Sequence, residues 1–296
     1  MKAFFALVHR ELLEHRGAFL IAPLALIGIL FSMLVLAYVT GRLNFELAGM
    51  ARPLPIRVFE IGFLGFAVAW WLYLLGVLFF YCADGFAADK RNNSMLFWKS
   101  MPQSDLKILL AKFGAATTLF PGLVYAAALA CGVLAYILTL IMVSATGGNL
   151  GVFMSGAFMS YLSIAGGILV ALAASILWFA PFLAWVGALS TAVGRWSVPL
   201  AVLVPALAVA IENMYVRGPS PEGGWIWSYL TYRLDFPVDR EGYLQAWFLS
   251  GARFDAYRFS LDLIDRMDWV QVLIGLAFAF AAIFVASEYR RRTIDN

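Results

Sequence analysis

Charged residues are scarce in this chain of 296 residues. Asp, Glu, Lys and Arg make up 13% of it, whereas 63% is hydrophobic, and the mean hydropathy is +0.84. Soluble domains carry about 25% charged residues. A soluble protein with so few charges could not cover its own surface, so the composition predicts an all-α, polytopic membrane protein whose outer surface is covered by lipid.

Cysteine and histidine are equally rare. Cys82 and Cys131 both lie in apolar runs, form no metal-binding or disulfide pattern, and are expected to be small packing residues. His9 and His15 lie six residues apart near the N-terminus, a poor spacing for metal ligands. No metal and no cofactor are therefore expected in this chain.

The common catalytic motifs are missing. The sequence has no G-x-x-x-x-G-K-[ST] phosphate-binding loop, no H-E-x-x-H and no G-x-S-x-G. Phe113 to Gly194 contains no charged residue, and the charged residues at the predicted spans, such as Arg195 and Glu212, fall at span ends. Ion-coupled carriers and proton relays usually need such groups inside the membrane. The chain is therefore not expected to be an enzyme, and a secondary transporter is disfavoured.

Six apolar runs are long enough to be membrane spans of about 20 residues. The predicted spans are residues 17–41, 61–83, 113–143, 163–194, 196–216 and 269–288. The turn-forming sequence Ser144 to Asn149 separates the third and fourth runs. Glu11 and Glu14 interrupt the N-terminal sequence, so it is not a signal peptide and the first span should be retained.

The lysines predict the orientation. With six spans both termini face the same side, and that side also holds the loop of residues 84–112 and the tail of residues 289–296. All five lysines fall on it, namely Lys2, Lys90, Lys99, Lys107 and Lys112. Because positive charge is enriched in cytoplasmic loops, we expect both termini in the cytoplasm of a bacterial cell and residues 217–268 outside the inner membrane.

Two segments beside the spans are predicted to be amphipathic helices. Residues 1–16 place Arg10 and Glu14 opposite an apolar stripe, which suits a helix lying in the membrane interface. The alternative is that they form the cytoplasmic end of a tilted first span.

The second amphipathic segment, residues 254–267, is expected on the outer membrane surface or as a cap over the spans. Its apolar arc comprises Phe254, Ala256, Tyr257, Ser260, Leu261, Leu263, Ile264 and Met267. Upstream, Trp225, Trp227, Tyr229 and Tyr232 suit the headgroup region. A role in gating a substrate is the alternative for this region.

The loop of residues 84–112 is the most polar part of the chain, yet it contains Phe97 and Trp98. Aromatic residues are favoured at interface cores, so this pair could anchor a partner protein. Pro102 fixes the backbone before Ser104, which can cap the next helix. The alternative is an interfacial Trp with snorkelling lysines. Charged and apolar residues that could set the docking register are Asp89, Lys90, Arg91, Met95 and Lys99.

Three sequence stretches resemble the ABC-2 type permeases, the membrane subunits of bacterial ABC exporters. "HRELLEHRGAFLIAPLALIGILF" resembles their opening, where a short helix with an R-E-L core, here Arg10-Glu11-Leu12, precedes the first span. "DGFAADKRNNSMLFWKSMPQSDLKILLAK" resembles their first cytoplasmic loop, and "ASEYRRRTIDN" their ending. Asp84 departs from the pattern, since Glu is frequent there. The matching loop positions are Asp84, Asp89, Arg91, Ser94 to Trp98, Ser100, Pro102, Ser104 and Lys112.

The resemblance implies a six-span fold of the type V exporter kind, with short extracytoplasmic helices between spans five and six that would include Tyr257, Leu261 and Ile264. It implies a homodimer or a pair with a sister permease, and two copies of a separate ATPase subunit that bind ATP and Mg. The 84–112 loop would then be the coupling element, with Arg10 and Glu11 on the preceding interfacial helix. Membrane lipid is an expected partner and nucleic acid is not. The alternative function is a membrane anchor or sensor subunit, and the sequence does not indicate a substrate.

Overall fold

The computed structural model describes residues 2–41, 55–91, 104–145, 150–217, 224–238, 243–250 and 253–294. Within these ranges every regular element is a helix and none is a strand. The predicted docking residues Met95, Phe97, Trp98, Lys99 and Pro102 lie outside the described residues, and their role remains a prediction.

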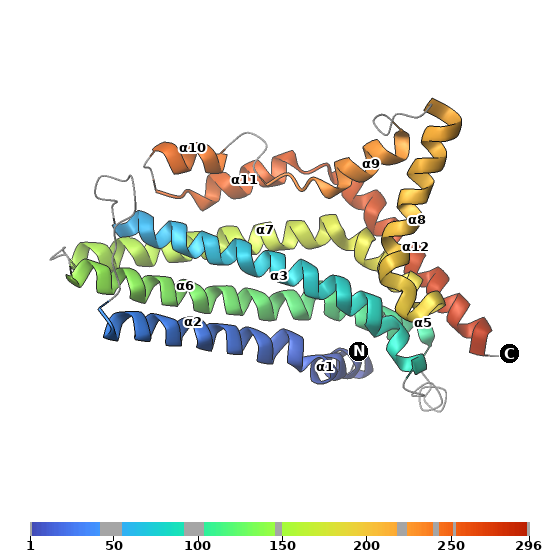
Figure 1. Ribbon diagram of the computed structural model, residues 1–296, viewed down its shortest axis with the longest axis horizontal. Helices are drawn as coiled ribbons and strands as arrows, with labels where there is room; N and C mark the ends of the chain where they lie inside the picture. The colour runs from blue at the N-terminus through green and yellow to red at the C-terminus, as the bar shows by residue number, and fades with distance from the viewer. Residues whose placement is uncertain are drawn as a thin grey trace.

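Four long apolar helices run side by side along the longest axis of the molecule (Figure 1). They are α2 (Ala22–Val39), α3 (Pro55–Arg91), α6 (Phe120–Ala145) and α7 (Leu150–Val193). The 37 residues of α3 and the 44 of α7 exceed the roughly 20 residues that cross a bilayer. Both helices are therefore longer than the spans predicted at 61–83 and 163–194, and part of each must extend beyond the hydrocarbon core.

The described residues of the polar segment between the second and third predicted spans are helical on both sides of residues 92–104. α3 continues to Arg91, and α5 (Asp105–Gly114) begins after Ser104, whose hydroxyl accepts a hydrogen bond from Lys107 N. A π-helical turn, η2 (Ala115–Leu119), joins α5 to α6. The segment predicted at 84–112 thus begins with the last turns of α3 and ends within α5, and its role as a cytoplasmic coupling element remains a prediction.

The N-terminal helix α1 (Lys2–Glu14) leads through a π-helical turn, η1 (Gly17–Ile21), into α2. The phenyl rings of Phe19 and Phe120 stack with centroids 3.7 Å apart, which attaches this turn to the start of α6. α1 and the last turns of α12 (Trp269–Ile294) lie near the same end of the bundle (Figure 1). This region is called the α1–α5 end below.

The chain changes direction sharply after α7. The turn η3 (Gly194–Trp196) separates α7 from α8 (Ser197–Glu212), which continues as η4 (Asn213–Arg217). Gly194 has φ +57°, a left-handed conformation that glycine adopts at little cost. As a result α8 leaves the bundle at a steep angle (Figure 1).

Three short helices follow, α9 (Trp225–Leu234), α10 (Tyr243–Ser250) and α11 (Ala256–Arg266). They lie along the bundle in Figure 1, and α11 packs against α7. The side chains of α11 that are buried are Ala256, Phe259 and Leu263.

The buried face of α11 includes Phe259, which the predicted apolar arc omitted. Tyr257, Leu261 and Ile264 of that arc are 75%, 42% and 39% exposed, and their place at the membrane surface remains a prediction. A helix that packs along a single neighbour buries only a narrow stripe, so the flanks of the arc remain uncovered.

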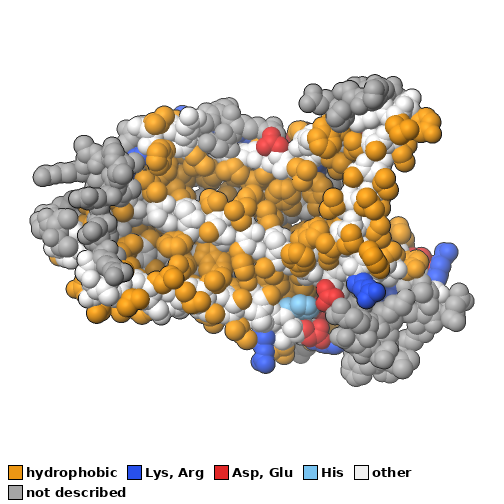
Figure 2. Space-filling view, viewed as in Figure 1, with side chains coloured by type: hydrophobic (Ala, Val, Ile, Leu, Met, Phe, Trp, Pro, Cys, Tyr) orange, Lys and Arg blue, Asp and Glu red, His pale blue; other side chains and the backbone are white. Residues whose placement is uncertain are grey.

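Five stretches in the described ranges are long and apolar enough to cross a membrane. They are Gly17–Val39, Pro55–Phe86, Asp105–Ser144, Phe153–Tyr215 and Trp269–Arg292. The fourth covers 63 residues and contains the fourth predicted span and all but the last residue of the fifth. Hydrophobic side chains cover most of the described surface in Figure 2, and charged groups gather near the α1–α5 end. The architecture is that of an all-helical, multi-pass membrane protein.

Candidate functional site

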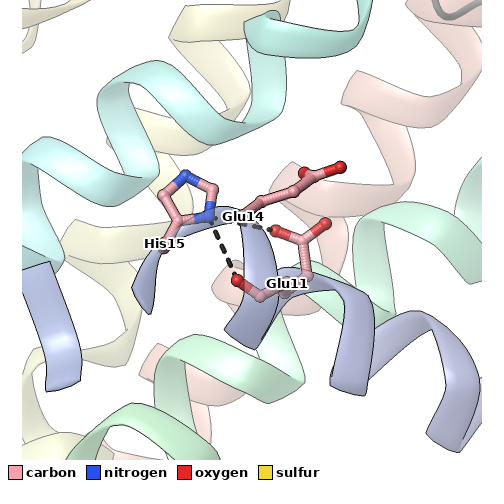
Figure 3. Close-up of side chains that lie close together, drawn as sticks. All are labelled: Glu11, Glu14 and His15. Atoms are coloured by element: carbon pink, nitrogen blue, oxygen red, sulfur yellow. Dashed lines mark hydrogen bonds and ion pairs between the residues drawn. The ribbon is translucent and has the colours of Figure 1, made fainter. Parts of the chain in front are cut away.

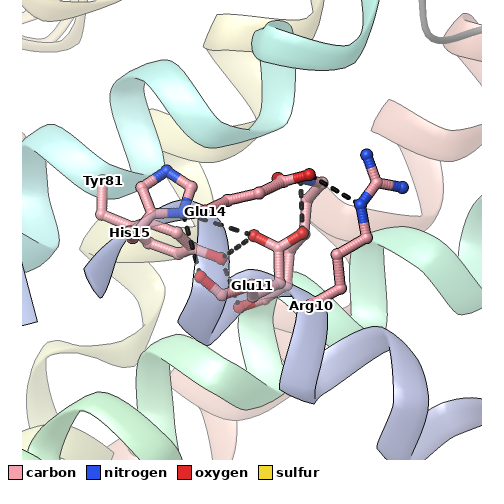
Figure 4. A network of polar contacts seen from close by, with 6 residues as sticks. Arg10, Glu11, Glu14, His15 and Tyr81 are labelled. Atoms are coloured by element: carbon pink, nitrogen blue, oxygen red, sulfur yellow. Dashed lines mark hydrogen bonds and ion pairs between the residues drawn. The ribbon is translucent and has the colours of Figure 1, made fainter. Parts of the chain in front are cut away.

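A buried ion pair joins the N-terminal helix to the start of the third apolar stretch. Nζ of Lys112 on α5 lies 2.8 Å from Oε1 of Glu11 on α1. Lys112 is 1% exposed and Glu11 5%. The hydroxyl of Tyr81 on α3 donates a hydrogen bond of 2.8 Å to the other oxygen, Oε2 of Glu11 (Figure 4). One carboxylate therefore holds three helices together.

The pair is a strong constraint because it is removed from water. A buried ion pair is not by itself a large source of stability, since desolvation offsets the attraction. Removing one partner, however, leaves an uncompensated buried charge, which costs about 3–5 kcal/mol. Tyr81 adds a second restraint, because its hydroxyl also lies 3.3 Å from the carbonyl oxygen of Lys112.

The rim of this site is more exposed. Nε of Arg10 lies 2.6 Å from Oε1 of Glu14, one helical turn along α1. His15 places Nδ1 3.3 Å from the carbonyl oxygen of Glu11, and its ring meets that of Tyr81 edge-on at 4.7 Å. Exposed pairs such as Arg10–Glu14 contribute at most about 1 kcal/mol. The buried Glu11 is therefore the residue on which the geometry depends.

Glu11, Glu14 and His15 each bring one potential ligand atom within 4.8 Å of the others (Figure 3). The Lys112 ammonium, however, already lies 2.8 Å from the Glu11 carboxylate. A divalent cation bound there would be repelled by that charge. Glu14 is likewise engaged by Arg10. The arrangement fits an ion-pair network better than a metal centre.

A second ion pair fixes the other end of α5. Nε of Arg290 on α12 lies 3.1 Å from Oδ1 of Asp105, the first residue of α5. Arg290 is 4% exposed. The neighbouring Arg291 and Arg292 pair instead with Glu288 on their own helix and are well exposed. α5 is thus held by the helices at both ends of the chain.

The predicted site residues are only partly described. Arg10 and Glu11 lie in the network, whereas Asp89, Lys90 and Arg91 lie on the last turn of α3. The sequence placed Lys112 in the loop pattern but did not reveal its partner, which lies 101 positions earlier. A lysine at the edge of a long apolar run was the available signal, since charges in such places usually have partners.

At the opposite end of α3, two further charged residues were missed. Glu60 is completely buried and accepts hydrogen bonds from Ser160 Oγ on α7 (2.8 Å) and from Phe254 N (3.2 Å). Nη2 of Arg57 donates to the carbonyls of Trp247 (3.0 Å) and Phe248 (2.7 Å) on α10. These contacts fasten α10 and the start of α11 to the bundle. The residues looked like ordinary flanks of a span because their partners are remote in the sequence.

Arg233 on α9 is a further buried charge that the sequence analysis missed. It is 1% exposed, its guanidinium carbon lies 4.5 Å from the centroid of the Trp178 ring, and Trp178 Nε1 donates to its carbonyl (2.8 Å). Nη1 lies 3.5 Å from the carbonyl oxygen of Gln271, and Nη2 has no hydrogen-bond partner among the described residues. The Trp178 ring supplies a cation–π contact for this guanidinium.

No family model, curated protein or solved structure matches the chain. The function is therefore inferred from the sequence and from the geometry of the two ends of α5.

Proposed function

We propose that this protein is the permease subunit of an ATP-binding cassette transporter, an exporter of the ABC-2 type driven by separate ATPase subunits. The observation that carries the proposal is the contact between Glu11 and Lys112. These residues belong to two separate sequence stretches on which the resemblance rests, the R-E-L core and the lysine before the third span. The buried ion pair brings them together.

The position of this pair also fits the proposal. Residues 92–104 connect α3 to α5, and Glu11 contacts both of these helices, through Tyr81 and through Lys112. A subunit that is moved by a partner needs its docking segment fixed firmly to its spans. In the proposed function Phe97 and Trp98 supply the apolar anchors, and the stem formed by α3 and α5 carries the movement.

The assembly follows from the same proposal. Two copies of the permease, or this chain and a sister permease, form the substrate pathway across a bacterial inner membrane. Two ATPase subunits bind ATP and Mg on the cytoplasmic side, where both termini of this chain lie. Six spans are proposed, with η3 separating the fourth from the fifth.

Purification from the native membrane tests the proposal. The tagged chain is extracted in a mild detergent, and its partners are identified by mass spectrometry and assayed for ATP hydrolysis. We expect a Walker-A ATPase to co-purify with the chain. The variant with Phe97→Ala and Trp98→Ala should lose the ATPase while still inserting into the membrane. A matched control is Trp225→Ala, since Trp225 is 80% exposed on α9. Absence of any ATPase from the wild-type complex would show that the proposal is wrong.

A further inference from the structure

α5 is held at both of its ends, and by helices from opposite ends of the chain. Lys112 pairs with Glu11 on α1, and Asp105 pairs with Arg290 on α12. The two α5 residues are seven positions apart, which is about two helical turns, so they lie on similar faces of the helix. Asp105 also lies two positions after residue 103, where the segment proposed to dock the ATPase ends.

The helices held in this way lead directly into membrane spans. α1 continues through η1 into α2, α5 continues through η2 into α6, and α12 is itself the last apolar stretch. A displacement of α5 therefore has two short routes to other spans, one through Glu11 and one through Arg290.

We infer that the Glu11–Lys112 and Asp105–Arg290 ion pairs are positioning contacts that make α1, α5 and the end of α12 move as one body. This inference rests on the proposed function and identifies the residues through which ATPase movement reaches the first and last spans. Docking depends on residues 92–103, whereas transmission depends on the two ion pairs.

Burial distinguishes these pairs from the other ion pairs of the described residues. Lys112, Glu11 and Arg290 are each no more than 5% exposed, whereas the Asp105 side chain is 29% exposed. Water is therefore kept from both charges of the first pair and from the guanidinium of the second. Charge pairs in a low-dielectric setting are much stronger than exposed ones. The Glu288 pairs with Arg291 and Arg292 are the internal contrast, because both arginine side chains are well exposed and both pairs remain within α12.

The experiment uses the complete permease–ATPase complex reconstituted in lipid nanodiscs. The main variant combines Glu11→Gln with Lys112→Met, which removes both charges and leaves neither one unpaired. A second variant combines Asp105→Asn with Arg290→Gln, and the conservative variant Lys112→Arg keeps the charge. Glu288→Gln is the matched control. Three quantities are measured: the ATPase retained on purification, the melting temperature, and the permease-dependent rate of ATP hydrolysis.

If the ion pairs are positioning contacts, each double variant should retain the ATPase at the wild-type level. The permease-dependent rate of ATP hydrolysis should fall about tenfold, a typical size for coupling between sites. Lys112→Arg should keep most of the rate, and Glu288→Gln should keep all of it. A wild-type rate in both double variants would overturn the inference. A fall in rate matched by a fall in melting temperature and ATPase retention would also overturn it, since that is the signature of a merely structural role. Failure of the wild-type chain to bind any ATPase would instead refute the proposed function itself.

Discussion

The guanidinium of Arg233 on α9 lies against the indole of Trp178 on α7, and Gly275 on α12 closes the third side. A Cβ at position 275 would collide with Nη2 of Arg233 and lie 3.2 Å from Cγ of Pro181. The glycine is therefore required by the close approach of three helices rather than by backbone conformation.

Gly275→Ala is expected to destabilise the protein by about 1–3 kcal/mol, the usual cost of overpacking. Thermal unfolding in detergent, followed by tryptophan fluorescence, measures the effect. Gly76→Ala is the matched control, because a Cβ at position 76 would meet nothing within 4 Å. Equal melting temperatures for the two variants would contradict the packing of α9 on α7 and α12.

Lys112→Met alone is expected to cost about 3–5 kcal/mol of stability, because it leaves Glu11 charged and buried without its partner. Adding Glu11→Gln should recover a large part of this loss, and a double-mutant cycle gives the coupling between the two residues. Urea or thermal denaturation of the purified chain measures both effects. Arg10→Ala is the control and should change the stability by less than about 1 kcal/mol, because its pair with Glu14 is exposed. Additive effects in the cycle would show that the two side chains do not interact.

Cysteines at positions 167 and 256 are expected to form a disulfide readily. An ideal Cβ on Gly167 would lie 3.2 Å from Cβ of Ala256, close to the separation of about 3.5–4.5 Å found in disulfides. Mild oxidation in native membranes, followed by non-reducing electrophoresis after cleavage between the two positions, detects the cross-link. The free residues Cys82 and Cys131 are buried and should not compete. Gly166→Cys paired with Ala256→Cys is the control, since a Cβ on Gly166 meets nothing within 4 Å. Equal cross-linking of the two pairs would mean that α11 does not pack on α7 in this register.

Arg57→Met is expected to loosen α10 while leaving the rest of the bundle intact. Arg57 donates to the carbonyls of Trp247 and Phe248, and its guanidinium lies 5.1 Å from the centroid of the Trp247 ring. Hydrogen exchange of the α10 amides should therefore become about tenfold faster, which corresponds to about 1.4 kcal/mol of local stability. Arg258→Met on the exposed side of α11 is the control and should leave α10 unchanged. Unaltered exchange in Arg57→Met would show that these hydrogen bonds do not hold α10.

Local features of the fold could be predicted from the sequence. The turn-forming residues from Ser144 to Asn149 mark the break between α6, which ends at Ala145, and α7, which begins at Leu150. Ser104 was expected to cap a helix and does so. These features depend on residues that are close together in the chain, where side-chain chemistry and backbone preference decide the outcome.

The charged contacts could not be predicted in the same way. Glu60 meets the backbone of Phe254, 194 positions later, and Glu11 meets Lys112, 101 positions later. Hydropathy locates an apolar run, but it does not say which helices become neighbours. For the same reason the sequence predicted that residues 254–267 form an amphipathic helix, but not that Phe259 would be buried while Tyr257 remained exposed.

The first apolar helix has one consequence for handling the protein. Among the residues of α2 only Pro23 is buried, while large side chains such as Leu24, Met33 and Leu36 are more than half exposed. Lipid or detergent, rather than the protein interior, must therefore cover most of the surface of this helix. Acyl chains of a bilayer fill that role evenly, whereas a small micelle covers the same surface poorly. The choice of detergent should accordingly affect the position of this helix before it disturbs any other part of the bundle.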